Sequence, residues 1–121
     1  LAQMAEANGR VARMLNQAAA AILVCGDLDR AFPPAPDFWV IDAAIAAQNM
    51  TLAANDLGIG SVWLGTWPDE KRVKRQAAIF QLPETIVPHS ILALGYPAED
   101  IDMRAVRPSR YEENRVHVNQ W

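Results

Sequence analysis

The sequence predicts a fold that combines helices with short strands. Apolar residues recur at helical spacing in three long segments, and three shorter apolar segments bounded by glycine or proline are typical of strands. The predicted helices are residues 3–19, 38–57 and 68–80, and the predicted strands are residues 20–25, 61–67 and 90–97. The length of 121 residues and the hydrophobic content of 51% fit one globular domain.

A helical segment followed by a buried strand begins the chain. In residues 3–19 the apolar side chains fall near one helical face, and Gly9 weakens the middle because glycine is a poor helix former. Ala20–Cys25 is a continuous apolar run, which is typical of a strand covered on both faces. Three prolines then predict a loop over residues 26–37.

The segment 38–57 has the strongest helical pattern. Alanines fill many of its positions, and isoleucine, methionine and leucine spread apolar surface almost all round it. A helix of this kind is buried on most sides, and a chain of this size can hardly cover it. We therefore expect the helix to lie at a subunit interface, with Gly58 as its C-terminal cap.

The second half of the chain predicts a helix, a strand and a polar tail. Pro68, Asp69 and Glu70 suit the first turn of the helix 68–80. Pro83 and Pro88 bracket a loop before the strand 90–97. Residues 98–121 are mostly polar, with a possible last strand at residues 116–118.

Charge and cysteine content narrow the class of protein. The formal charge of −3 at pH 7 gives no basic surface for nucleic acid or for a membrane. No apolar run is long enough for a transmembrane helix. The single cysteine, Cys25, excludes an internal disulfide framework and fits a reducing compartment, so we expect a cytoplasmic protein.

The stretch LGIGSVWLGTW, residues 57–67, is the first candidate site. It is not a phosphate loop, because its third glycine is late and it follows a helix where such a loop follows a strand. Two interpretations remain open: a simple turn, which the residues alone favour, or close approach of the backbone to a flat ligand at Gly60 and Gly65. Trp63 and Trp67 would then line the binding site of that ligand.

The other polar side chains are weaker candidates for a functional site. His89, His117 and Cys25 lack metal-ligand spacing. We discount a nucleophilic role for Ser90 beside His89, because neighbours on an extended segment point to opposite faces. The basic residues of the helix 68–80 predict a solvated face.

The C-terminal stretch RPSRYEENRVHVNQW contains several arginines close in sequence to aromatic residues. Arg107, Arg110 and Arg115 can grip a phosphate in bidentate fashion, with Tyr111 and Trp121 nearby in sequence. An ordinary charged tail is an equally good interpretation.

Three stretches in order resemble the nitroreductase family of flavin enzymes. They are DAAIAAQNMTLAANDLGIGSVWLG, LPETIVPHSILALGYPAED and RPSRYEENRVHVNQW. The similarity runs from about Met14 to Trp121 and is clearest from Asp37 onward. The resemblance implies an α+β fold, with a mostly antiparallel sheet flanked by helices, and a homodimer.

It also implies FMN at the dimer interface. NAD(P)H would reduce the flavin, and a nitroaromatic or quinone-like acceptor would reoxidise it. A related chemistry such as reductive dehalogenation is a further possibility. The alternative from another class is a non-catalytic dimerisation or binding domain that retains the scaffold without the cofactor.

The resemblance assigns cofactor-binding residues but no catalytic side chain and no metal ligand. Trp63, Leu64, Gly65 and Thr66 match the segment that lies along the flavin ring, where backbone N–H groups near Gly65 and Thr66 can donate to its N5 edge. Arg110 matches the basic residue that reaches the flavin phosphate, and Arg107 is the second choice.

The family's Arg-rich N-terminal region has no counterpart in this sequence. We therefore expect residues 1–121 to form a single nitroreductase-like domain from the C-terminal portion of a longer chain. We also expect this chain to bind FMN weakly by itself, because the missing region supplies much of the family's cofactor contact.

Overall fold

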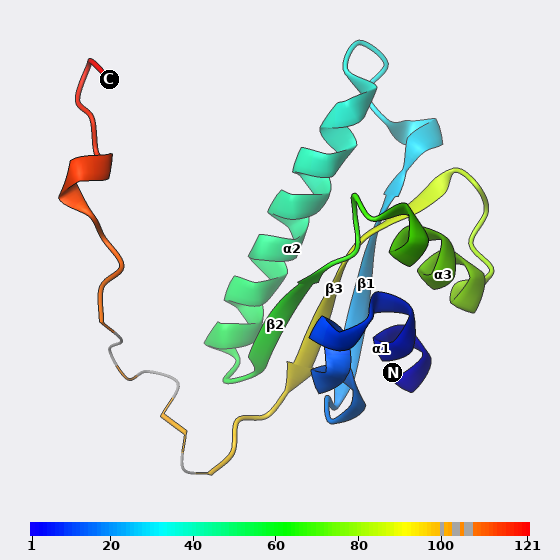
Figure 1. Ribbon diagram of the computed structural model, residues 1–121, viewed down its shortest axis with the longest axis horizontal. Coiled ribbons are helices and arrows are strands. Elements are labelled where there is room, and N and C mark those ends of the chain that lie inside the picture. Colours follow the sequence, from blue (N-terminus) through cyan, green and yellow to red (C-terminus); the bar gives the residue numbers. More distant parts are fainter. Residues whose placement is uncertain (100, 103–104, 106–107) are drawn as a thin grey trace.

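A three-stranded antiparallel sheet forms the centre of the molecule (Figure 1). The computed structural model describes residues 1–99, 101–102, 105 and 108–121. β3 (Ile86–Gly95) lies between β1 (Ala20–Asp27) and β2 (Gly60–Gly65). The mixture of helices with an antiparallel sheet confirms the α+β fold.

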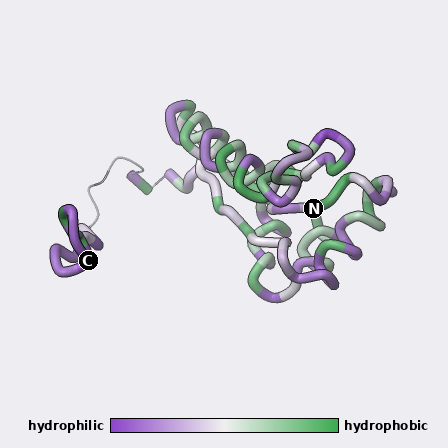
Figure 2. Tube along the Cα trace, turned by 90° about the horizontal axis from the view of Figure 1, so that it is seen from above, coloured by the Kyte–Doolittle hydropathy of each residue, from purple (hydrophilic) through white to green (hydrophobic). Residues whose placement is uncertain are grey.

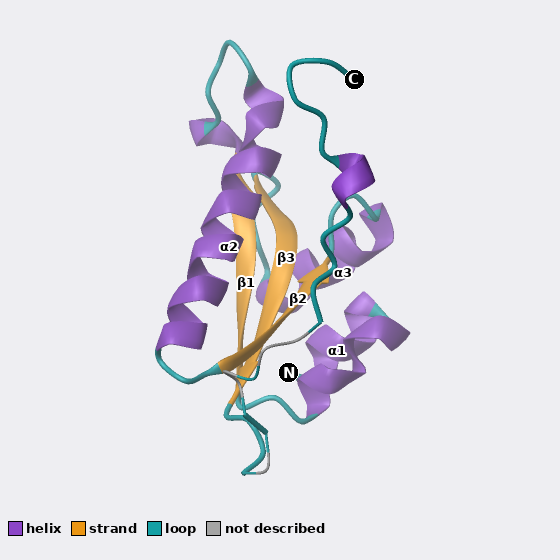
Figure 3. Ribbon diagram, turned by 90° about the vertical axis from the view of Figure 1, so that its left-hand side faces the viewer, coloured by secondary structure: helices purple, strands orange, loops and turns teal. Residues whose placement is uncertain are grey.

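Helices cover both faces of this sheet (Figure 3). α2 (Trp39–Asp56) lies on one face. The opposite face carries α1 (Ala2–Asn8), the short helix η1 (Arg10–Asn16) and α3 (Glu70–Phe80). Gln76 of α3 ties this layer together by donating from Nε2 to the Met4 carbonyl at 2.8 Å.

Alternation along β3 builds two hydrophobic cores. Ile91 and Ala93 pack on the α1 side with Leu15 and Leu64. Leu92 packs on the α2 side against Val24, Ala43 and Ala47. Because successive side chains of a strand point to opposite faces, one central strand supplies both cores.

The predicted helix 3–19 is divided at Gly9, so a single helix is wrong there. Gly9 has φ +83° and ψ −172°, a conformation that only glycine adopts without strain. α1 ends at Asn8, and the next turn is a 3₁₀ helix. Asn8 therefore stands at a helix end, fully buried.

The end of α2 confirms the predicted glycine cap. Gly58 has φ +71°, and its N–H donates to the Asn55 carbonyl at 3.1 Å. The Ile59 N–H donates to the Ala54 carbonyl at 2.8 Å. These two bonds are the Schellman pattern, and they turn the chain directly from α2 into β2.

β3 is longer than predicted because it runs through Pro88. Val24 pairs with Ser90 and Cys25 with Pro88, so His89 is an extra residue in a β-bulge. A bulge tolerates proline inside a sheet, since the local ladder is already interrupted. The predicted loop before this strand is accordingly shorter than the two prolines indicate.

The C-terminal residues 108–121 lie apart from the sheet-and-helix body (Figures 1 and 2). Residues 108–121 contain one short 3₁₀ helix, η4 (Glu113–Arg115). The possible strand at residues 116–118 does not form. Among the described residues, no helix combines the length and the apolar character that crossing a membrane requires.

Candidate functional site

The candidate site lies at the end of β2, an edge strand of the sheet. Its residues are Trp63 to Trp67, and the turn that follows leads into α3. Asp69 caps α3, because its Oδ1 accepts from the backbone N–H groups of Lys71 at 3.0 Å and Arg72 at 3.2 Å. The segment is therefore anchored on both sides by regular structure.

Four rings gather beside this segment. Trp39 meets Trp67 edge-on with ring centroids 5.2 Å apart, and it meets His89 at 5.9 Å. Trp63 lies 6.3 Å from His89. Trp63 and Trp67 keep 38% and 39% of their surface exposed, so both offer aromatic area to a ligand.

Sequence reasoning missed Trp39, although one signal pointed to it. A Cβ atom on Gly26 would stand 2.3 Å from Cε3 of the Trp39 ring. Glycine is required there because the indole packs directly on the β1 backbone. A glycine inside an apolar strand was the available sign of such a close approach.

His89 is the titratable member of this ring cluster. Burial lowers the pKa of its imidazole below the ordinary value of 6.5. Its Nδ1 lies 3.1 Å from Ser90 Oγ, so the expectation that the two side chains diverge is wrong. Ser90 is nevertheless fully buried, and it cannot serve as a nucleophile for an external substrate.

The two glycines singled out in the sequence have different surroundings. A Cβ on Gly60 would stand 3.2 Å from the Gly95 carbonyl oxygen, so close strand pairing explains that glycine. A Cβ on Gly65 would find only the Trp67 carbonyl oxygen, at 3.9 Å. The space beside Gly65 is therefore open.

Hydrogen bonding sets the direction of the backbone at Gly65. The N–H groups of Thr66 and Trp67 both donate to the His89 carbonyl, at 3.1 and 2.9 Å, so the Thr66 N–H is already engaged. Because N–H direction alternates along a strand, the Gly65 N–H points away from β3, toward the open edge. Of the two predicted backbone donors, only the Gly65 N–H is thus directed away from the sheet.

A partly buried polar network holds the Gly65 carbonyl. Asn8 Nδ2 and Arg72 Nη1 both donate to it, each at 3.2 Å. Thr66 Oγ1 donates to Asn8 Oδ1 at 3.0 Å, and Arg72 also pairs with Asp69 at 3.3 Å. Neither donor was identified from the sequence, because Asn8 carries no local signal and Arg72 was expected on a solvated helix face.

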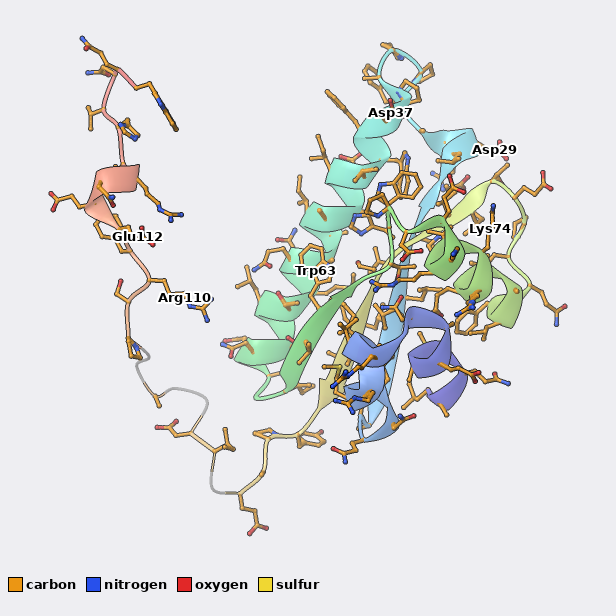
Figure 4. All side chains as sticks on the ribbon, in the orientation of Figure 1. Asp29, Asp37, Trp63, Lys74, Arg110 and Glu112 are labelled. Atoms are coloured by element: carbon orange, nitrogen blue, oxygen red, sulfur yellow. The ribbon has the colours of Figure 1, made fainter. Side chains whose placement is uncertain are left out.

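The remaining predicted residues are not brought to this place. The Leu64 side chain is buried in the core on the α1 side. Arg110 is exposed on the C-terminal segment, apart from the sheet that carries Trp63 (Figure 4). Arg107 lies outside the described residues. Among the described residues, Trp63, Gly65 and Thr66 therefore lie together, and Arg110 of the tail lies apart from them.

A separate hollow lies at the other edge of the sheet. It has a volume of about 590 Å³ and lies between β1, the following loop and α2. Arg30, Asp42 and Trp39 are among its lining residues. It shares Trp39 with the ring cluster, but β3 separates it from Gly65.

Fold and site together define an α+β protein with an aromatic, glycine-opened edge strand. The family model for the nitroreductase family matches residues 3–96, and the chain belongs to that family.

Relatives and a solved structure agree with this membership. A Methanothermobacter thermautotrophicus protein is 41% identical over 108 residues, covering 89% of this chain and 53% of its own. An Archaeoglobus fulgidus protein is 42% identical over 109 residues, covering 90% and 62%. Both are named, provisionally, NADH dehydrogenase/NAD(P)H nitroreductase. The chain thus spans between half and two thirds of these relatives' length.

The solved structure is an FMN-dependent nitroreductase from Clostridium difficile. It is 25% identical, with a TM-score of 0.82, and the alignment covers 100% of this chain and 69% of that one.

Proposed function

We propose that this chain is part of an FMN-dependent oxidoreductase that takes two electrons from NAD(P)H. The electrons pass through the flavin to nitroaromatic or quinone-like acceptors. The observation that carries the proposal is the open backbone of Gly65 beside the exposed ring of Trp63. The names of the relatives support the electron donor, and the name of the Clostridium difficile protein supports the cofactor.

The residues at the end of β2 fit a flat, electron-accepting ring. The missing Cβ of Gly65 lets backbone approach such a ring closely, and the outward Gly65 N–H can donate to it. When bound, FMN supplies the two-electron chemistry itself. The part of this chain is to hold the ring and to aim a fixed N–H dipole at the negative charge that reduction creates.

A homodimer completes the proposal. α2 packs on the sheet through its alanines Ala43, Ala47 and Ala54. Its outward face leaves large apolar side chains more than half exposed, namely Phe38, Ile41, Ile45 and Leu52. A second copy would cover this surface.

The phosphate contact is proposed for Arg110, with Arg107 as the second choice. The Arg110 guanidinium suits a phosphate, but its segment lies apart from Gly65 within one chain. The contact therefore requires either a different placement of the segment or a second copy of the chain. We also propose a cytoplasmic location, since Cys25, the single cysteine of this sequence, is a free thiol.

An absorbance experiment tests the function. The full-length protein that carries this chain is reconstituted with FMN, and NADH or NADPH is added under argon. We expect flavin absorbance that bleaches with one of the donors and returns when a nitroaromatic or a quinone is added. A halogenated aromatic in place of these acceptors tests for dehalogenation.

A protein that stays colourless after reconstitution would contradict the proposal. It would support the alternative of a non-catalytic dimerisation domain that retains the scaffold.

A further inference from the structure

The peptide group between Gly65 and Thr66 is held at both of its polar ends. Its N–H donates to the His89 carbonyl at 3.1 Å. Its carbonyl accepts from Asn8 Nδ2 and from Arg72 Nη1, each at 3.2 Å. Three hydrogen bonds therefore fix the plane of one peptide, and they come from three separate parts of the chain.

The orientation of Asn8 is itself determined. Thr66 Oγ1 donates to Asn8 Oδ1 at 3.0 Å, which leaves Nδ2 as the group that faces the Gly65 carbonyl. Asn8 and Thr66 are 0% and 1% exposed, so no solvent competes for these bonds. The side chain of Thr66 thus acts on the peptide through Asn8.

A glycine at this position needs such restraint. Without a Cβ, Gly65 has more backbone freedom than any other residue, and the open space beside it adds no steric limit. A donor contributes most to binding when its direction is fixed before the ligand arrives. Holding this peptide restrains the Gly65 backbone on one side. The pairing of Leu64 with Ile91 restrains the preceding peptide, which carries the Gly65 N–H.

We propose that Asn8 and Thr66 are positioning residues, which with Arg72 hold the Gly65–Thr66 peptide and thereby restrain the Gly65 backbone, so that the outward N–H of Gly65 favours the reduced form of a bound flavin. This inference rests on the proposed function. Neither Asn8 nor the Thr66 hydroxyl needs to touch the cofactor. Their effect is carried by the Gly65 backbone.

The test compares near-isosteric variants in the full-length protein reconstituted with FMN. Thr66→Val removes the hydroxyl that orients Asn8, and Thr66→Ser restores it. Asn8→Asp removes the donor to the Gly65 carbonyl. Thr51→Val is the matched control, because the Thr51 hydroxyl donates within α2 to the Gln48 carbonyl at 2.7 Å and is not part of this network.

The readouts are the FMN dissociation constant and the midpoint potential of the bound flavin. We expect Thr66→Val and Asn8→Asp to weaken reduced flavin about tenfold more than oxidised flavin. For a two-electron couple this lowers the potential by about 30 mV. Thr66→Ser should recover most of that shift, and Thr51→Val should cause none.

A variant of a partly exposed residue keeps the test informative if the buried variants fail to fold. Arg72→Met removes the second donor to the Gly65 carbonyl from a side chain that is 34% exposed, so the fold should persist. Its matched control is Lys74→Met, which breaks only the exposed pair with Glu70 at 3.5 Å. Arg72→Met should lower the potential in the same direction, and Lys74→Met should not.

Two results would count against different claims. If the wild-type protein binds no FMN, the proposed function itself fails. If it binds FMN but Thr66→Val and Thr66→Ser give the same potential, or Arg72→Met leaves it unchanged, the positioning role is overturned and the network is merely structural.

Discussion

Gly65 ends β2 with open space where a side chain would stand. We predict that Gly65→Val weakens FMN binding about a hundredfold or more, because the added methyl groups occupy the space that a flat ring would need. The fold should tolerate the change, since valine suits a strand and its Cβ meets no atom closer than 3.9 Å.

Fluorescence titration with FMN measures this effect, and a thermal melt checks the fold. Ser61→Val is the control, because residue 61 lies on the same face of the same strand. Equal FMN affinity in Gly65→Val and Ser61→Val would show that Gly65 serves only as a turn.

We predict that His89 makes the free energy of unfolding depend on pH. Since burial lowers its pKa in the folded protein below the ordinary 6.5, the unfolded chain binds a proton more readily. Its contribution is therefore fully present above pH 6.5 and is lost as the pH falls from there toward the lower folded pKa. Urea unfolding at a series of pH values measures this trend. In His89→Phe, which keeps a ring beside Trp39 and Trp63, the slope between pH 6.5 and 5 should be smaller.

At the scale of single residues, sequence analysis identified the candidate-site residues that can be recognised from their neighbours in the sequence. Trp63 and Gly65 stand two positions apart and attract notice together. Asn8 and Arg72 were missed because their role arises from contacts across the fold. Asn8 meets the Gly65 segment from 57 positions away, and no spacing rule links a helix-end asparagine to a strand-end carbonyl.

At the scale of elements, hydrophobic periodicity predicted α2 and α3 well. It failed where one residue overrides the pattern. Gly9 adopts a backbone conformation that ends α1, and the bulge at His89 admits Pro88 into β3. The first effect is local to one glycine. The second depends on the pairing of β3 with β1, which a periodic pattern does not contain.

The outward face of α2 carries a prediction about assembly. Ile45→Glu places a charge in the middle of the exposed apolar face, and we expect it to convert a homodimer into a monomer, because an unpaired charge is costly to bury. Light scattering after size-exclusion chromatography gives the mass. Val11→Glu is the control, since Val11 is equally exposed at 57% but lies on η1, on the opposite face of the sheet. If both variants remain dimeric, the dimer uses another surface.

At the scale of the whole molecule, the tail and the body are separate in space (Figure 2). The sequence suggested a last strand at residues 116–118, but none of the residues that the structure describes pairs with this segment. Strand formation requires a partner, and a single sequence cannot show whether that partner exists within the chain.

The position of Arg110 on that tail gives a prediction that separates phosphate from ring binding. In the full-length protein, Arg110→Ala should weaken FMN about tenfold or more by removing a charge-assisted bond to the phosphate, yet leave riboflavin, which lacks the phosphate, unchanged. Titration with both ligands tests this. Arg115→Ala is the control, because Arg115 already pairs with Glu112 at 2.7 Å. An equal loss of both ligands would argue against a phosphate contact.

The bulge in β3 has a consequence for how the candidate site opens. One carbonyl, that of His89, accepts the N–H groups of both Thr66 and Trp67. A fluctuation that pulls His89 out of line must release both amide protons together. Hydrogen–deuterium exchange should therefore show these two amides exchanging at matched rates, in step with His89 rather than with the outer part of β2. The opening rate at the end of β2 then depends on the opening of the central strand β3, and the local stability of the candidate site depends on that strand.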